Sequence, residues 1–302
     1  MSKLLYGFFY VLSLLPMFIL YGIGDIIFVI FYYLVGYRKE VVWNNLKIAF
    51  PEKTDKELES IRRKCFRNFI HTWIETVKFI SISDKQLNKM VTGDFSLIEK
   101  LRPTQPRITW LSGHFMNWEL FAIYPAKHIS YPYLGVYMPL TNKAFDDLFI
   151  KIRGRSGVNL LRAGNMRTDM MPWRNKDYVL VLGADQNPPN PNNAVWLNFF
   201  GQPTAFVTGP EKNARAGNTA VIFSWMEKTG LGKYVFHVEL LCEDPSLLEK
   251  NEIQRRYVKR LEEIITLHPD NYLWTHKRWK HSWKKEYENL WIDTVPPPEV
   301  EG

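Results

Sequence analysis

Residues 107–127 read RITWLSGHFMNWELFAIYPAK, an apolar strand pattern followed by a glycine turn and a helical pattern. Residues 108–111 are typical of a buried strand, and residues 115–127 have the apolar spacing of a helix. The alternation continues, with expected strands at 133–137, 158–161, 178–183, 221–226 and 235–240 and expected helices at 142–155, 166–173, 209–216 and 246–267. It predicts a layered α/β fold around a central, mostly parallel sheet.

A long apolar run, LLYGFFYVLSLLPMFILYGIGDIIFVIFYYLV, precedes this region at residues 4–35, and Asp25 is its only formally charged residue. The run exceeds the roughly 20 residues that a spanning helix requires. Because Pro16 interrupts it, we expect either one tilted transmembrane span or a helix followed by a segment in the membrane interface. Residues 1–37 are therefore predicted to be a membrane anchor, and a buried core helix is the soluble alternative.

The composition limits the partners and the compartment. The chain has 302 residues, with 39 Lys and Arg against 31 Asp and Glu, which gives a net charge of +8. This balance favours an anionic partner such as phospholipid, lipopolysaccharide or nucleic acid. Lys3 alone precedes the apolar run while many cations follow it, so the positive-inside rule places the bulk of the protein in the cytoplasm. The two cysteines, Cys65 and Cys242, need no disulfide and allow no metal cluster.

The remaining chain is expected to form one catalytic domain over residues 38–294 and a disordered tail over residues 295–302. Near its start, Thr54 and Glu57 have the spacing of a capping box, which predicts a helix over residues 54–80. The apolar positions of this helix, Cys65 among them, recur at helical spacing and predict a buried face.

The sharpest local signal for chemistry is His114 followed by Glu119 in the H-x4-E pattern. A second such pair, His281 and Glu286, lies among lysines with no strand before it, and we interpret it as surface. His114 instead follows a glycine at the end of a strand, where α/β folds place their sites. If His114 lies in the turn and Glu119 early in the helix, Glu119 can hold the imidazole while His114 removes a proton from a hydroxyl. The alternative is a satisfied core histidine.

Other chemistries have weaker support in the sequence. The chain has no HExxH motif and no paired histidines for zinc. It also has no phosphate-loop, dinucleotide-binding or esterase fingerprint, and nothing supports a covalent cysteine.

Seven ordered blocks are spread over nearly the whole chain: residues 45–52 (NLKIAFPE), 113–120 (GHFMNWEL), 137–139 (YMP), 153–155 (RGR), 184–186 (ADQ), 198–201 (NFFG) and 269–280 (PDNYLWTHKRWK). Together these blocks closely resemble the late acyltransferases of lipid A biosynthesis, the lauroyl/myristoyl transferases within the wider lysophospholipid acyltransferases. One position departs from the family pattern, because Met138 stands where the family commonly has arginine.

The resemblance implies transfer of a fatty acyl chain from a thioester to a hydroxyl of a lipid A precursor, without a cofactor and without an acyl-enzyme. The donor is acyl-acyl-carrier protein or acyl-coenzyme A, and the place is the cytoplasmic face of a bacterial inner membrane. His114 would be the general base and Glu119 its partner. Arg155 would bind an acceptor phosphate, and Asp185 would orient that arginine or the acceptor sugar, unless the two form a structural ion pair. Further substrate-binding positions are Asn117, Gln186 and Arg162. Arg162, Arg167 and Lys212 are the candidates to replace the missing arginine, and simple surface charge is the alternative for each.

Two rival functions stay open at this stage. The acceptor could be another membrane lipid, such as a lysophospholipid or an amino-acid lipid, and Met138 makes this the nearest rival. Alternatively, a non-catalytic protein could bind anionic lipid through the basic, tryptophan-rich stretch at residues 274–291. Nucleic-acid binding is not expected, since nothing resembles a nucleic-acid fold.

Overall fold

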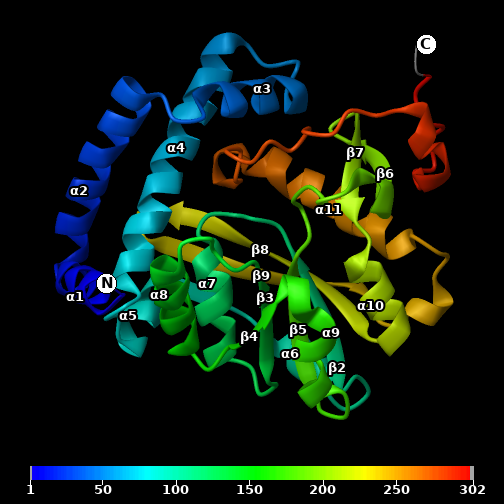
Figure 1. Cartoon of the computed structure of the whole chain (residues 1–302), viewed down its shortest axis with the longest axis horizontal. Helices are drawn as coiled ribbons and strands as arrows, with labels where there is room; N and C mark the ends of the chain where they lie inside the picture. Colours follow the sequence, from blue (N-terminus) through cyan, green and yellow to red (C-terminus); the bar gives the residue numbers. More distant parts are fainter. Residues whose placement is uncertain (1, 300–302) are drawn as a thin grey trace.

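A seven-stranded sheet forms the centre of the computed structural model, which describes residues 2–299 (Figure 1). Its strand order is β1-β9-β8-β2-β5-β3-β4. The strands are β1 (Val91–Gly93), β2 (Arg107–Ser112), β3 (Tyr133–Tyr137), β4 (Asn159–Arg162), β5 (Tyr178–Gly183), β8 (Ala220–Gly230) and β9 (Lys233–Cys242). All neighbouring pairs are parallel except the β8–β9 hairpin, which confirms the predicted mostly parallel sheet.

Helices cover both faces of this sheet (Figure 1). They are α1 (Ser2–Ser13), α2 (Met17–Val29), α3 (Lys39–Ala49), α4 (Asp55–Lys78), α5 (Asp84–Met90), α6 (Ser96–Leu101), α7 (Trp118–Ile123), α8 (Lys143–Gly154), α9 (Met166–Asp169), α10 (Gly209–Gly217) and α11 (Glu252–Leu267). Within β2, Trp110 and Leu111 belong to different hydrophobic clusters, one on each face. Because a strand buried on both faces needs apolar residues at nearly every position, residues 108–111 are apolar except for Thr109, whose buried hydroxyl is hydrogen bonded to that of Thr219.

Local capping fixes where the helices near the site begin. The Thr54–Glu57 capping box starts α4, as predicted. The helix expected at 115–127 begins later, as α7, because the Asn117 side chain caps it by accepting a hydrogen bond from the backbone of Glu119. The helix expected from residue 246 begins at Glu252, because Asp244 caps a separate turn of 3-10 helix at 245–247.

A second, antiparallel sheet of β6 (Ala194–Phe199) and β7 (Gln202–Val207) lies apart from the main sheet. The tryptophan-rich C-terminal segment packs on it, and the ring of Tyr287 stacks on buried Trp196 with 4.9 Å between centroids. Trp274 is also fully buried. Two of this segment's five Trp and Tyr side chains are therefore buried and the other three are half-buried against hydrophobic clusters, so they are less open to anionic lipid than the sequence suggested.

The N-terminal apolar run is divided into two helices by a break at residues 14–16. The second is continued by a π-helix, Ile30–Val35, and the stretch Met17–Val35 is long and apolar enough to cross a membrane. In the tail, Val295 and Pro298 accept hydrogen bonds from tryptophan side chains, although residues 294–299 form no helix or strand. The remainder of the tail that we expected to be disordered, residues 300–302, lies outside the described residues.

Candidate active site at the ends of β2 and β5

His114 and Asp185 occupy equivalent places at the carboxyl ends of two adjacent parallel strands. Ser112, the last residue of β2, is in register with Gly183, the last residue of β5. His114 and Asp185 each follow two residues later, so the pairing of the strands brings their loops together. This edge of a parallel sheet is where α/β folds usually bind ligands.

Asp185 holds His114 through two hydrogen bonds. Nδ1 of His114 lies 2.6 Å from Oδ1 of Asp185, and the His114 backbone N–H donates to Oδ2 at 2.9 Å. The Asp185 side chain is 1% exposed, whereas that of His114 is 28% exposed. The carboxylate is therefore buried behind the imidazole, and the open side of the ring carries Nε2.

The two groups shift each other's ionisation in opposite directions. Burial by itself would lower the pKa of His114, but the charge and hydrogen bond of Asp185 outweigh it and raise that pKa above 6.5. Burial would likewise raise the pKa of Asp185, but the charge of His114 and the hydrogen bonds from it hold that pKa well below the usual range. Asp185 is thus a carboxylate that favours an imidazolium at His114.

Close packing fixes the loop that carries His114. A Cβ at Gly183 would lie 2.9 Å from Cε1 of His114, and a Cβ at Gly113 would lie 2.6 Å from Cδ1 of Leu261 on α11. Only glycine at these two positions lets the ring and the helix approach so closely. In addition, the backbone N–H of Leu273 donates to the His114 carbonyl at 3.1 Å.

Glu119 does not take the place that the sequence predicted for it. Both of its carboxylate oxygens accept hydrogen bonds from Arg153 on α8, at 2.8 and 2.7 Å, and the carboxylate is 2% exposed. Asp185, not Glu119, holds the imidazole. Glu119 nevertheless lies close enough that its charge also raises the pKa of His114, after the larger effects of burial and Asp185.

The predicted arginines lie elsewhere. Arg155 points away from the site, and its guanidinium donates to the backbone carbonyls of Phe79 and Ile80. Arg162 pairs with Asp169 at 2.6 Å on the surface. These contacts correct the expected phosphate-binding role of Arg155 and the proposed substitute role of Arg162.

Arg153 is the site arginine that the sequence analysis missed. It belongs to the same Arg-Gly-Arg block as Arg155, but residues two apart on a helix point about 200° away from each other, so only one of them can face the site. No signal in the sequence favours Arg153, because Arg155 follows Leu148 and Ile152 at the spacing of their own helix face. Arg153 is held within α8 beside Phe149.

Asn117 and Gln186 have different surroundings. Asn117 is fully buried, and besides capping α7 it donates through Nδ2 to Glu75 on α4 at 2.9 Å. Glu75 also accepts from Tyr21 and Tyr234, at 2.8 and 2.7 Å. Asn117 therefore positions the α7 helix. Gln186 directly follows Asp185 and is half-buried.

A second residue missed from the sequence is His276, in the block at 269–280. Its Nε2 accepts a hydrogen bond from the backbone of Asn187 at 3.1 Å, just after the Asp185 loop. Burial, opposed by Asp185 and reinforced by the charge of Arg278, lowers the pKa of His276 to about 4. A neutral His276 beside a protonatable His114 leaves one titrating imidazole at this edge of the sheet. Only the family block, not a motif, marks this histidine in the sequence.

An aromatic cluster of Phe69, Trp73, Trp118 and Phe149 borders the Glu119–Arg153 pair. Ring centroids of neighbouring members are 5.8–6.1 Å apart. Trp73 is 40% exposed and the other three are partly buried. The α4 face that was expected to be core is therefore open at Phe69 and Trp73, next to the site.

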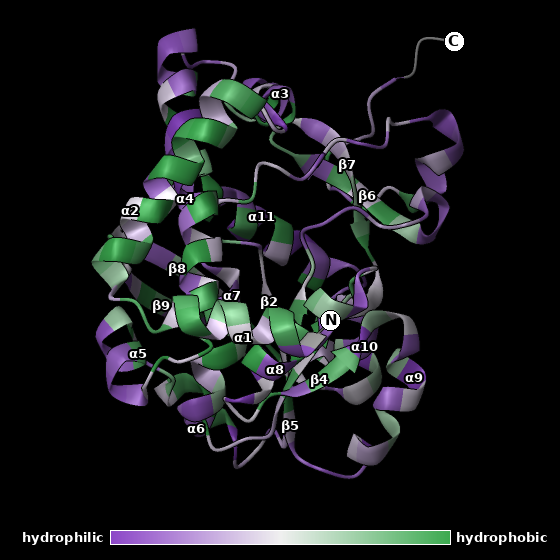
Figure 2. Ribbon diagram, turned by 60° about the vertical axis from the view of Figure 1, so that its left-hand side comes forward, coloured by the Kyte–Doolittle hydropathy of each residue, from purple (hydrophilic) through white to green (hydrophobic). Residues whose placement is uncertain are grey.

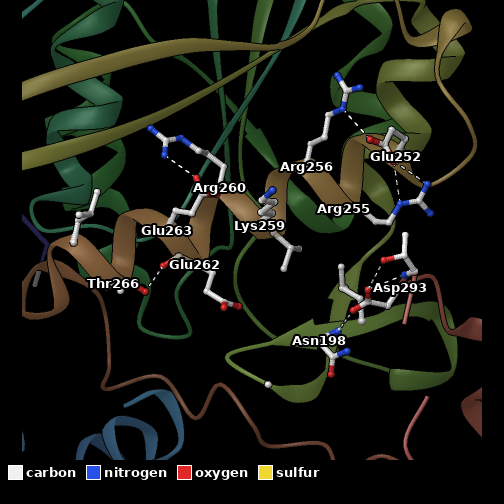
Figure 3. Close-up of a pocket in the computed structure, with 15 residues that line it drawn as sticks. Asn198, Glu252, Arg255, Arg256, Lys259, Arg260, Glu262, Glu263, Thr266 and Asp293 are labelled. Carbon is white, nitrogen blue, oxygen red and sulfur yellow. Dashed lines mark hydrogen bonds and ion pairs between the residues drawn. The ribbon is translucent and has the colours of Figure 1, made fainter. Parts of the chain in front are cut away.

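A cavity of about 1050 Å³ is lined by residues of α11, by β6 and its turn, and by Asp293 and Thr294 (Figure 3). Its lining is charged, and the charges pair within it, as Arg255 and Arg256 do with Glu252. None of the predicted site residues lines this cavity. The chemistry of His114 is thus separate from this cavity.

The family model described as "Bacterial lipid A biosynthesis acyltransferase" matches residues 2–281. The chain belongs to this family. It is 26% identical over 249 residues to the lipid A biosynthesis acyltransferase of Haemophilus influenzae, covering 80% of this chain and 78% of that protein. It is 26% identical over 252 residues to the lipid A biosynthesis lauroyltransferase of Escherichia coli, covering 80% and 79%. The Escherichia coli lipid A biosynthesis palmitoleoyltransferase is 21% identical over 247 residues, with 80% and 79% covered.

Membership of the lipid A acyltransferases confirms the resemblance stated from the sequence blocks. The chain is an acyltransferase, and the family places its activity in lipid A and lipopolysaccharide biosynthesis. A lipid A-type molecule is the acceptor that the family implies.

Proposed function

We propose that this lipid A acyltransferase moves a fatty acyl chain from an acyl thioester directly to a hydroxyl of a lipid A precursor. The observation that carries the proposal is the His114–Asp185 pair. An imidazole fixed by a buried carboxylate, with its other nitrogen on the open side, is the arrangement of a general base for a hydroxyl. Acyl-acyl-carrier protein or acyl-coenzyme A is the donor.

The reaction proceeds through one tetrahedral intermediate. Nε2 of His114 takes the proton of the acceptor hydroxyl while the hydroxyl oxygen forms a bond to the thioester carbonyl carbon. Asp185 stabilises the imidazolium that results, which is the state its charge favours. The intermediate then collapses, the C–S bond breaks, and the leaving thiolate takes the proton back from His114. No acyl-enzyme forms, in keeping with both cysteines being buried.

Arg153 supplies the positive charge that binds the substrate. Glu119 accepts from Nε and Nη2 of Arg153, which fixes the guanidinium plane and leaves Nη1 to donate to a phosphate oxygen of the acceptor. We therefore transfer to Arg153 the role that the sequence gave to Arg155. Glu119 acts as a positioning residue for this arginine.

The aromatic cluster of Phe69, Trp73, Trp118 and Phe149 provides an apolar surface for an acyl chain beside the reacting groups. Its half-exposed rings would be covered on binding, and each methylene buried contributes about 0.8 kcal/mol. A chain lying on these rings would bring its carbonyl end toward Glu119 and His114.

The protein acts while attached to the cytoplasmic face of the bacterial inner membrane. The exposed apolar N-terminal helices and the net charge of +8 support attachment to anionic lipid. The cations that follow the apolar run support the cytoplasmic side.

The test is a transfer assay on purified, detergent-solubilised full-length chain, with products identified by mass spectrometry. Acyl-carrier-protein and coenzyme A thioesters compete as donors, and a lipid A precursor competes with a lysophospholipid as acceptor. We expect acylated lipid A precursor, and no mass increase of the protein incubated with donor alone. Transfer only to the lysophospholipid would refute the acceptor and direct attention to Met138, which is 66% exposed where the family commonly has arginine. An acylated protein would refute direct transfer.

A further inference from the structure

The N-terminal helices present an apolar surface that nothing in the described part of the chain covers. The most exposed apolar side chains of the molecule include Leu4, Phe18 and Leu34, at 82%, 76% and 79% exposure. Other exposed apolar side chains in this region include Phe8, Val11, Leu14, Ile26 and Val35. Figure 2 shows α1 and α2 as neighbouring hydrophobic ribbons on the side of the molecule turned forward. A patch of this extent is typical of an interaction surface.

The opposite side of α2 is fastened to α4 along its length. Asp25 forms a bidentate ion pair with Arg67, at 2.7 Å for both contacts, and lies 2.9 Å from Nε2 of His71. One turn earlier, Tyr21 donates to buried Glu75 at 2.8 Å. The single charge within the apolar run is thus neutralised by the catalytic domain.

The contact with α4 continues within α2 and into the π-helix that follows it. Tyr32, in the π-helix, hydrogen bonds with Glu59 and Arg62 of α4. Gly24 packs so closely that a Cβ there would lie 3.0 Å from Cγ1 of Ile74. The helix therefore belongs to the folded domain and is not a separate anchor on a linker.

This attachment is incompatible with a helix that crosses the bilayer. The α4 segment that contacts α2 runs from Glu59 to Glu75, about 24 Å of helix, which is most of the thickness of the hydrocarbon. If α2 stood across the membrane, α4 would stand beside it. Its exposed cations, Arg63, Lys64 and Arg67, would then lie in hydrocarbon, where charged side chains are strongly disfavoured.

We infer that α1, α2 and the π-helix do not span the membrane but lie on one leaflet, with their exposed apolar side chains inserted below the headgroups. A helix that is apolar all round needs cover on every side, and here α4 covers one side and lipid covers the other. The exposed rings of Tyr10, Tyr33 and Tyr37 lie at the headgroup level, and Lys3 and Arg63 meet anionic phospholipid. The inference rests on the membrane attachment stated under Proposed function and specifies its geometry.

Helix α1 connects the proposed lipid-facing surface to the helix that carries residues of the site. α1 contacts α8 through Tyr6, whose ring lies under the ammonium of Lys151, and through Phe9 beside Phe145. The same helix α8 carries Phe149 of the aromatic cluster and Arg153. A lipid in the contacted leaflet therefore meets the aromatic cluster without leaving an apolar surface.

Cysteine accessibility in Gram-negative cells distinguishes the two geometries without any activity assay. Lys3→Cys and Glu40→Cys place thiols at the two ends of the N-terminal helices, and the native Cys65 and Cys242 are buried, so the wild-type chain gives the background. We expect a membrane-impermeant maleimide to label neither variant in intact spheroplasts and both in inverted vesicles. Labelling of Lys3→Cys in intact spheroplasts would show a span and overturn the inference. Recovery of the chain in the soluble fraction would instead overturn the membrane attachment itself.

A vesicle-partition experiment tests which side chains insert. The double variant Phe18→Glu/Leu34→Glu should partition at least about a hundredfold more weakly into phosphatidylethanolamine–phosphatidylglycerol vesicles, because each buried side chain of this size contributes about tenfold or more. The matched control is Met171→Glu/Leu247→Glu, which alters apolar side chains that are 70% and 81% exposed elsewhere on the surface. The control should bind as the wild type does. Equal binding by both double variants would contradict the inserted face.

Discussion

Replacing Asp185 by asparagine removes the charge behind His114 while preserving the size of the side chain. The carboxylate is 1% exposed and accepts hydrogen bonds from both the ring and the backbone of His114. The oxygen of asparagine can still accept one of these two hydrogen bonds. Its NH₂ group must then lie opposite the other N–H group of His114, for which it cannot act as an acceptor. We expect kcat to fall roughly 10²–10⁴-fold, the range for losing a general base or its correct tautomer.

The pH dependence supplies a second, independent readout. In the wild type, Asp185 raises the pKa of His114 against the opposing effect of burial, so the activity should increase with pH through a pKa above 6.5. In Asp185→Asn, only burial and the weaker charge effects of Glu119 and Arg153 still act on the pKa of His114. The acidic limb of the profile should therefore move to lower pH, while the plateau stays far below that of the wild type.

Glu227→Gln is the matched control for this experiment. Glu227 pairs with His237 at 3.1 Å on the surface, so this change also removes a carboxylate from a histidine but leaves the site intact. It should leave both kcat and the pH profile unchanged. An Asp185→Asn enzyme with an unshifted acidic limb and less than about threefold loss of kcat would refute the assignment of Asp185 as the partner of the base.

Three further changes test the surroundings of the base. Gly183→Ala brings a methyl group to 2.9 Å from the His114 ring, so steady-state kinetics should show kcat reduced about 10–10²-fold with little change in KM. An unchanged kcat would mean that the position of the ring is unimportant. Arg153→Lys loses the bidentate contact with Glu119 and should raise KM for a phosphorylated acceptor about tenfold or more, whereas equal KM values would exclude this arginine from binding. Asn117→Ala removes a helix cap and a buried hydrogen bond, about 2–4 kcal/mol together, and calorimetry should record a fall in Tm of several degrees.

The α/β architecture was predictable because its strands carry their burial in the sequence. Residues 108–111 and 178–183 are apolar at almost every position, as strands covered on both faces must be, and they form the neighbouring strands β2 and β5. The His114 position followed from the same pattern, since the residue after a strand and a glycine falls at the edge of the sheet. The capping box at Thr54 fixed the start of α4 for a purely local reason.

The partners of His114 could not be derived in the same way, because they depend on contacts between distant segments. The spacing to Glu119 indicated a local pair, whereas Asp185 lies 71 residues away, in the loop that follows β5. Which arginine of the 153–155 block faces the site depends on the rotation of α8, which a block of letters does not record. The N-terminal run was ambiguous for a similar reason, since only the folded chain shows Asp25 paired with Arg67.

The measurement that tests the central claim most directly is acyl transfer to a lipid A precursor by the full-length chain carrying His114→Ala. His281→Ala is the matched control, because His281 belongs to the second H-x4-E pair, and Nε2 of its ring lies 3.1 Å from the carbonyl oxygen of Pro188. We predict that His281→Ala transfers as the wild type does and that His114→Ala, folded to the same Tm within a few degrees, loses transfer by at least about 10²-fold. Transfer by His114→Ala at the wild-type rate would contradict the account.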